Sequence, residues 1–320
     1  AGYGGIVVTG IATFSSTGSF SGDITVNSAT VGRGANSVAG NTVVGESALD
    51  AATTGGNNTV VGKYGATNLT TGVQNTALGY NSLADLTTTN NNTAVGYQAL
   101  KANVSSGNSA LGHSALAANT TGSGNVAVGK GALLVNTGGN YNVAVGQNTL
   151  DANNATGNTA IGHEALSANT TGTANVSVGT YSLDANTTGS HNTAVGYEAL
   201  GANTTAGYNT AVGRYAMRQN TTGSDNAALG YNALDANSTG DYNTALGSGT
   251  LGANTTGDDN TAVGKNALAA NTTAIQNTAV GSFAADALTT GNYNTAVGYN
   301  AYSAATTGTF NMAFGNQAMG

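Results

Sequence analysis

The chain has 320 residues, of which only 7 % are charged, and its formal net charge of −7 comes from 14 acidic and 7 basic side chains. Scattered cations on an acidic chain argue against nucleic-acid binding, which needs clustered Lys and Arg to neutralise phosphates. The chain contains no Cys and no apolar run near the ~20 residues of a membrane span, so we expect neither disulfides nor membrane insertion.

Residues 1–40 do not follow the period of the rest of the chain. Residues 5–14 and 22–27 have the β-branched and aromatic content of strands, with Gly and Ser turns between them. Residues 27–32 resemble a degenerate first repeat, 14 residues before Asn41. We therefore expect residues 1–40 to form a β-rich cap module where the chain enters the repeat array.

From Asn41 onwards an Asn-x-[Ala/Val/Ser]-[Val/Leu/Ile/Phe]-Gly box occurs 17 times, and 14 of the 16 intervals between boxes are 17 residues long. A short period that is kept this strictly is typical of a solenoid, in which each unit packs on its neighbours. We predict an all-β fold, a β-solenoid or β-roll of about 17 coils over residues 41–320, with the last coil incomplete. Positions within a coil are counted from the box Asn as position 1, so residues 192–208 form one complete coil.

Each coil offers two apolar positions for a core. Position 4 is always large and apolar, and position 9 is Leu in most coils. Where position 9 is Ala66 or Ala285, Leu69 or Leu288 stands at position 12 instead of the usual Asn, which indicates that positions 9 and 12 share one interior. Stacked Asn amides at positions 1 and 12 can bond the coils above and below. Representative core residues are Val195, Leu200, Asn203, Val212, Leu234 and Val263.

Two large apolar side chains per coil make a thin core, so an isolated coil stack is marginal in stability. Three chains around a common axis would share an interior. We therefore predict a homotrimer, with a thin monomeric solenoid as the alternative. Because the chain stops inside a coil without a polar cap, end-to-end stacking into a self-assembling extracellular filament is a further alternative.

The boxes at residues 158–162, 192–196 and 294–298 resemble the repeats of phage tail fibres and, less closely, the shorter head repeats of trimeric autotransporter adhesins. The Tyr-x-Ala-Leu at residues 197–200 and the Asn-Thr-Thr-Gly at residues 186–189 match the tail-fibre pattern. The resemblance implies a trimeric β-roll in an extracellular fibre, on a virion tail or cell surface. Such a segment would act as a shaft or adhesive head that attaches to a host glycan or protein receptor.

Two stripes vary from coil to coil, one just after the box Gly and one just before the next Asn. Variable turns of a repeat array are typical binding surfaces, and their aromatic rings could stack on sugars. The competing explanation is that turns tolerate most residues, or that some rings pack between chains. The receptor-binding candidates are Tyr97, Tyr141, Tyr197, Tyr208, Tyr231, Tyr242, Tyr293 and Tyr299.

Other functions have weaker support in the sequence. Asp241, Asp258 and Asp259 fall on one stripe and could hold Ca²⁺, but no calcium-loop motif is present and a solvated acidic patch is favoured. No nucleophile motif, phosphate loop or metal-spaced cluster occurs, so we expect neither an enzyme nor a cofactor. Thr pairs at positions 13 and 14 suggest ice binding, but adjacent Thr residues in a strand point to opposite faces.

Overall fold

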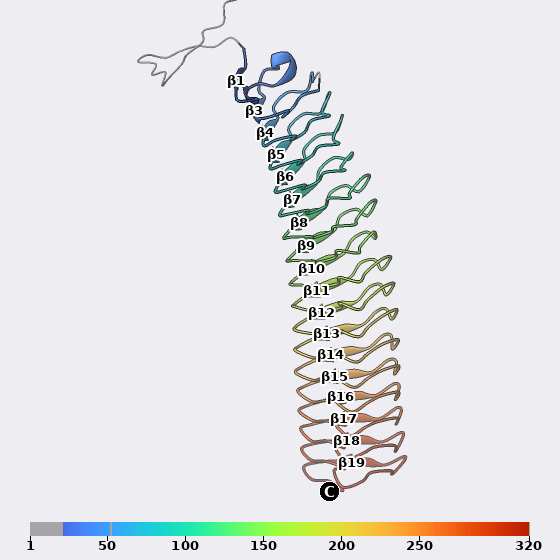
Figure 1. Ribbon diagram of the computed structural model, residues 1–320. Helices are drawn as coiled ribbons and strands as arrows, with labels where there is room; N and C mark the ends of the chain where they lie inside the picture. The colour runs from blue at the N-terminus through green and yellow to red at the C-terminus, as the bar shows by residue number, and fades with distance from the viewer. Residues whose placement is uncertain (1–21, 52, 320) are drawn as a thin grey trace, which may run out of the picture.

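The computed structural model is an elongated, gently curved rod in which the chain winds through successive stacked coils (Figure 1). It describes residues 22–51 and 53–319, so the strand predicted at residues 5–14 lies outside the described residues. The predicted all-β solenoid is confirmed: 19 strands form one sheet, and the only helix in the described part is the short 3₁₀ turn η1 (Ala35–Ser37).

Each coil contributes one short strand to a long parallel sheet. Consecutive strands from β3 to β19 pair in register, so that Ala194 of β12 lies beside Ala211 of β13. Equivalent side chains therefore stand in columns about 4.8 Å apart along the rod. The strands are β3 (Thr42–Gly45), β4 (Thr59–Val61), β5 (Thr76–Leu78), β6 (Thr93–Val95), β7 (Ser109–Leu111), β8 (Val126–Val128), β9 (Val143–Val145), β10 (Thr159–Ile161), β11 (Val176–Val178), β12 (Thr193–Val195), β13 (Thr210–Val212), β14 (Ala227–Leu229), β15 (Thr244–Leu246), β16 (Thr261–Val263), β17 (Thr278–Val280), β18 (Thr295–Val297) and β19 (Met312–Phe314).

The described residues before the array form an antiparallel hairpin. Strands β1 (Ile24–Val26) and β2 (Ala29–Gly32) pair with each other, and β2 then pairs antiparallel with β3, with Val31 beside Val44. The interpretation of residues 27–32 as a degenerate first coil is therefore wrong, because a coil strand would run parallel to β3. The carboxylate of Asp23 accepts hydrogen bonds from the backbone N–H groups of Arg33 and Gly34 and fixes the chain leaving the hairpin.

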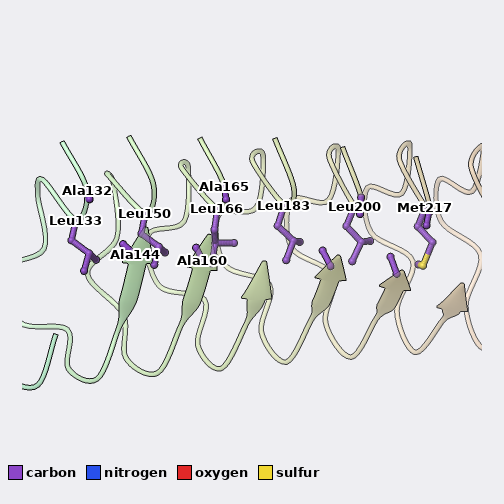
Figure 2. Packing of buried hydrophobic residues seen from close by; sticks show 14 of the residues in the cluster. Ala132, Leu133, Ala144, Leu150, Ala160, Ala165, Leu166, Leu183, Leu200 and Met217 are labelled. Atoms are coloured by element: carbon purple, nitrogen blue, oxygen red, sulfur yellow. The ribbon is translucent and has the colours of Figure 1, made fainter. Parts of the chain in front are cut away.

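The interior of the rod lies between the sheet and an opposite wall built from positions 8 and 9. Figure 2 shows Leu133, Leu150 and Leu166 in a row on that wall, pointing toward the strands. The small strand residues at position 3, such as Ala144 and Ala160, are fully buried beneath them. The burial predicted for Leu200, Leu234 and the other position 9 leucines is confirmed.

The prediction that positions 9 and 12 share one interior is confirmed. Leu69 and Leu288 at position 12 are fully buried, as are Ala66 and Ala285 at position 9. The exchange of volume is not strict, because Leu83 and Leu86 occupy positions 9 and 12 of one coil and both are fully buried.

The predicted core role of position 4 is wrong. Val195, Val212 and Val263 are only half-buried, and Leu229 at the same position is 52 % exposed. Successive side chains of a strand point to opposite faces, so a buried position 3 turns positions 2 and 4 outward. Leucines from the opposite wall fill the space beneath the strand, which leaves room for Ala or Ser in most coils and for a larger residue only at Val43 and Val60.

Two ladders of buried Asn side chains hold the coils in register, as predicted. At position 12, Asn203 donates from Nδ2 to Asn186 Oδ1 (2.9 Å) and accepts at Oδ1 from Asn220 Nδ2 (3.1 Å). At position 1, Asn192 donates from its backbone N–H to Asn175 Oδ1 (2.9 Å). Asn203 thus satisfies buried polar groups in two coils, which a hydrocarbon side chain could not do. The position 12 ladder is interrupted after Asn136 and ends at Asn271, whose buried Oδ1 atoms accept no hydrogen bond from the described residues.

Candidate functional site

The outward side chains of β3 to β19, at positions 2 and 4, form a continuous surface that we call the strand face. Position 2 is Thr in most coils and otherwise Ser, Val, Ala or Met, so no charged side chain interrupts the face. Position 4 adds an apolar column that runs along the whole array. Its position 4 residues are Val44, Val61, Leu78, Val95, Leu111, Val128, Val145, Ile161, Val178, Val195, Val212, Leu229, Leu246, Val263, Val280, Val297 and Phe314.

The strand face is uneven, with hollows where a position 2 side chain is small. Ser109 and Ala227 replace larger residues at position 2, and a shallow hollow lies at each. The hollows have volumes of about 160 and 210 Å³, and Leu111, Leu229 and Leu246 border them. Such alternation of small and large apolar groups is what interdigitating surfaces need.

Aromatic rings stack along the turn that follows the box Gly. In the first four coils that carry them, Tyr64, Tyr80, Tyr97 and His113 form a ladder whose neighbouring ring centroids are 5.8, 5.4 and 4.8 Å apart. Rings at these separations attract one another beyond their simple burial. The ladder is therefore ordered before any ligand arrives.

A second ladder runs through the middle of the array and alternates between positions 6 and 7. It contains His163, Tyr181, Tyr197, Tyr215 and Tyr231, with neighbouring centroids 5.5 to 6.4 Å apart. Two guanidinium groups lie over the ring of Tyr215, those of Arg214 at 4.4 Å and Arg218 at 4.7 Å. These cation–π contacts fix the ring edges that remain open to solvent.

The turn before the next box carries the most exposed rings. Tyr141 and Tyr208, both at position 17, are 70 % and 63 % exposed, and Tyr208 stacks on His191 with centroids 5.0 Å apart. All of the tyrosines predicted as receptor contacts expose 40 % or more of their surface: Tyr97, Tyr141, Tyr197, Tyr208, Tyr231, Tyr242, Tyr293 and Tyr299. Their exposure allows contact with a ligand and does not by itself identify one.

Two of the aspartates considered as calcium ligands instead accept hydrogen bonds from backbone N–H groups. Asp241 Oδ1 accepts from Ser224 N (2.7 Å), and Asp258 Oδ1 accepts from Asp241 N (2.8 Å). Asp259 points from the exposed position 17 beside them. Within residues 22–51 and 53–319, no group of three or more His, Cys, Asp or Glu is placed to hold a metal ion. The geometry therefore gives the calcium hypothesis no support.

Thr hydroxyls at position 13 are also engaged within the protein. Thr187 Oγ1 donates to the carbonyl of Thr204 (3.0 Å), and Thr204 Oγ1 donates to that of Thr221 (3.2 Å). The position 14 partner is exposed, as Thr205 is, and most position 13 partners are partly buried, with Thr170 as an exposed exception. The paired Thr array proposed for ice binding is thus not present as one water-facing surface.

Two parts of these surfaces were not predicted from the sequence. The variable stripe after the box Gly covers positions 6 and 7, but its named candidates did not include Tyr64, Tyr181 and Tyr215, which join the ladders at position 7. Phe283, also at position 7, makes an edge contact with Tyr299. The signal was present, because neighbouring coils place aromatic residues at position 6 in one and position 7 in the next. The strand face was missed because position 4 was assigned to the core.

One acidic group beside the second ladder is electrostatically unfavourable. Burial, together with repulsion from Glu198 and Glu164, raises the pKa of Asp184 to about 6. Its ionised form is therefore less stable in the folded protein than in the unfolded chain. This contribution lowers stability progressively as pH rises from about 4 through about 6.

We therefore expect Asp184→Asn to raise the melting temperature at pH 7.5 and to leave it nearly unchanged at pH 4, where Asp184 is already protonated. Circular dichroism melts at both pH values measure this difference. Asp225→Asn, on the exposed position 17, is the control and should change neither melt. An equal shift of the Asp184→Asn variant at both pH values would contradict the electrostatic explanation.

Searches for related proteins add nothing to this geometry. Comparisons with protein-family models, curated protein sequences and solved structures found no match for the chain. None of the helices in the described residues is long and apolar enough to cross a bilayer. The strand face and the aromatic ladders are therefore the features that bear on function.

Proposed function

We propose that the chain is a structural segment of an extracellular attachment fibre, in which three copies associate through their strand faces and the aromatic ladders contact a host surface. The strand face carries the proposal, because it is uncharged and presents a large apolar side chain at position 4 in every coil. Stacked coils supply stiffness and reach. The similarity of the boxes to tail-fibre repeats supports the same function.

The size of the strand face supports association. Soluble monomers rarely leave a continuous apolar patch larger than a few hundred Å². Seventeen position 4 side chains, each leaving about 60 Å² accessible, present roughly 1,000 Å² in each chain. Stable protein interfaces bury about 800 Å² per partner, so the total area that one chain offers is of the right order, although a trimer divides it between two neighbours.

A threefold arrangement also suits the position of the turns. Around one axis, a single face of each chain meets two neighbours, whereas the turns at positions 6, 7 and 17 lie at the edges of the strand face or beyond it. Rings such as Tyr208 and Tyr231 then remain outside, where they can stack on the apolar faces of sugar rings.

Sedimentation equilibrium tests the assembly. The wild type is expected at three times the chain mass of 31.0 kDa. Leu229→Asp combined with Leu246→Asp places two charges on the strand face and should reduce the mass to that of one chain, because a buried unpaired carboxylate strongly opposes association. The control Thr239→Asp with Thr256→Asp adds the same charges at exposed position 14 of the same coils and should remain trimeric.

Other results would redirect the proposal. A wild type that sediments as a single chain refutes the trimer. Long end-to-end filaments in electron micrographs favour the self-assembling structural polymer, in which the aromatic ladders need no receptor.

A further inference from the structure

A notch lies beside the second aromatic ladder and is bordered by its Tyr181 ring. It has a volume of about 460 Å³, within the range of sites that hold small ligands. None of its residues belongs to positions 2 or 4, so the strand face and the notch are separate surfaces. The residues around it are Tyr181, Asp184, Glu198, Gly201, Ala202, Arg218 and Gln219.

The notch exists because Gly201 supplies no side chain at position 10. The coil before it carries Asp184 at that position and the coil after it carries Arg218, while other coils carry Lys101 or Leu134. A Cβ added at Gly201 would meet Asp184 Oδ1 at 3.5 Å, an ordinary contact distance. The fold therefore accepts a side chain there, and the space above Gly201 is bordered directly by a carboxylate.

The charges that remain open at the notch are negative. Arg218 is already paired, with Nε 3.2 Å from Asp235 Oδ1 and Nη2 3.3 Å from Asp235 Oδ2. In the described part of the chain, Asp184 and Glu198 form no ion pair with a basic side chain. Tyr181 adds an aromatic wall, and it is ordered by an edge contact with Tyr197.

Two carboxylates beside an aromatic ring select for a cation, since each interacts favourably with a protonated amine. The donors of Gln219 and the paired Arg218 border the same space and suit hydroxyl groups next to that amine. An acidic sugar would meet repulsion from Asp184 and Glu198. A neutral acetylated sugar would leave both carboxylates without a positive partner.

We propose that the notch at Gly201 binds an amino sugar, with its protonated amine between Asp184 and Glu198 and its ring against Tyr181. This inference rests on the proposed attachment function, because it assigns one subsite and one chemical class to the host glycan. The three coils that build the notch occur once in the array, so each chain offers one such site.

Isothermal titration at pH 7 with a glucosamine tetramer and with its N-acetylated counterpart tests the inference. The wild type should bind the free amine form, and acetylation should weaken binding at least tenfold. Gly201→Leu fills the notch with leucine, which another coil already carries at position 10 as Leu134. This variant should also lose at least tenfold in affinity for the free amine form. Asp184→Asn should weaken binding of the amine form alone.

Gly252→Leu is the matched control, because Gly252 also stands at position 10, three coils further on. It should bind like the wild type, and both leucine variants should keep the wild-type circular dichroism melt. Equal affinity for the two tetramers, or full binding by Gly201→Leu, would overturn the inference.

Attachment itself is measured separately on an array of neutral, acidic and amino glycans. If Gly201→Leu binds the array as the wild type does, the notch is not the subsite but the attachment function stands. If the wild type binds no glycan on the array, the glycan-attachment function fails together with the subsite.

Discussion

Alanine in place of Gly196 should break the stack where its coil meets the next one. Gly196 has φ of 137°, a conformation that side-chain-bearing residues rarely adopt. A Cβ there would lie 2.5 Å from the carbonyl oxygen of Gly213 and 2.6 Å from its carbon. Both atoms are backbone and cannot swing aside, so the coils would have to separate. We expect a loss of at least about 3 kcal/mol in the free energy of unfolding.

Gly201→Ala is the control for this prediction. Gly201 is one turn further along the same coil, has no positive φ, and a Cβ there meets only ordinary contacts. Its melt should stay within a degree or two of the wild type. Thermal unfolding followed by circular dichroism compares the two variants, and equal melts would show that backbone contact between box glycines does not hold the coils together.

The repeat period made most of the fold predictable. A residue that recurs every 17 positions must stand in a column, so Asn203 had to meet Asn186 and Asn220 whatever the shape of the coil. The same reasoning predicted the glycine column, because no other residue ends each strand. These inferences need only stacking, and the parallel register from β3 to β19 supplies it.

The direction of the strand side chains needed more than the period. A three-residue strand such as Thr193–Val195 can bury either its middle residue or its two ends, and the larger Val suggested the ends. The available volume instead requires the small middle residue to be buried, because Leu200 already fills the interior opposite the strand. One coil carried the signal: Val60 replaces Ala at position 3 where Gly65 replaces Ala at position 8, and a Cβ on Gly65 would lie 2.8 Å from Val60 Cγ1.

The candidate surfaces were predictable in part for the same reason. Exposure of turn residues such as Tyr141 follows from their variability alone. The notch was not predicted, because Asp184, Gly201 and Arg218 are 17 residues apart and meet only when one position is read across successive coils. Its character depends on one missing side chain, which motif searches along the chain do not detect.

Asn203→Ala should be a strongly destabilising polar substitution inside the rod. Asn203 Nδ2 donates to Asn186 Oδ1 at 2.9 Å and to the carbonyl of Ala206 at 3.1 Å, while its Oδ1 accepts from Asn220. Truncation leaves these buried groups short of partners in a space that water does not reach. Each buried polar group left unpaired costs about 1–3 kcal/mol, so we expect the variant to lose about 3 kcal/mol or more.

The control is Asn68→Ala, which replaces an exposed Asn at position 11 by the residue that most coils carry there. Hydrogen exchange followed by mass spectrometry should show that Asn203→Ala exchanges faster than the wild type in the coils on both sides of residue 203. The control should exchange at the wild-type rate. Exchange confined to residue 203 itself would contradict a ladder that couples neighbours. Coupling is expected because Asn203 bonds both the coil before it and the coil after it, so its loss removes support from both neighbours.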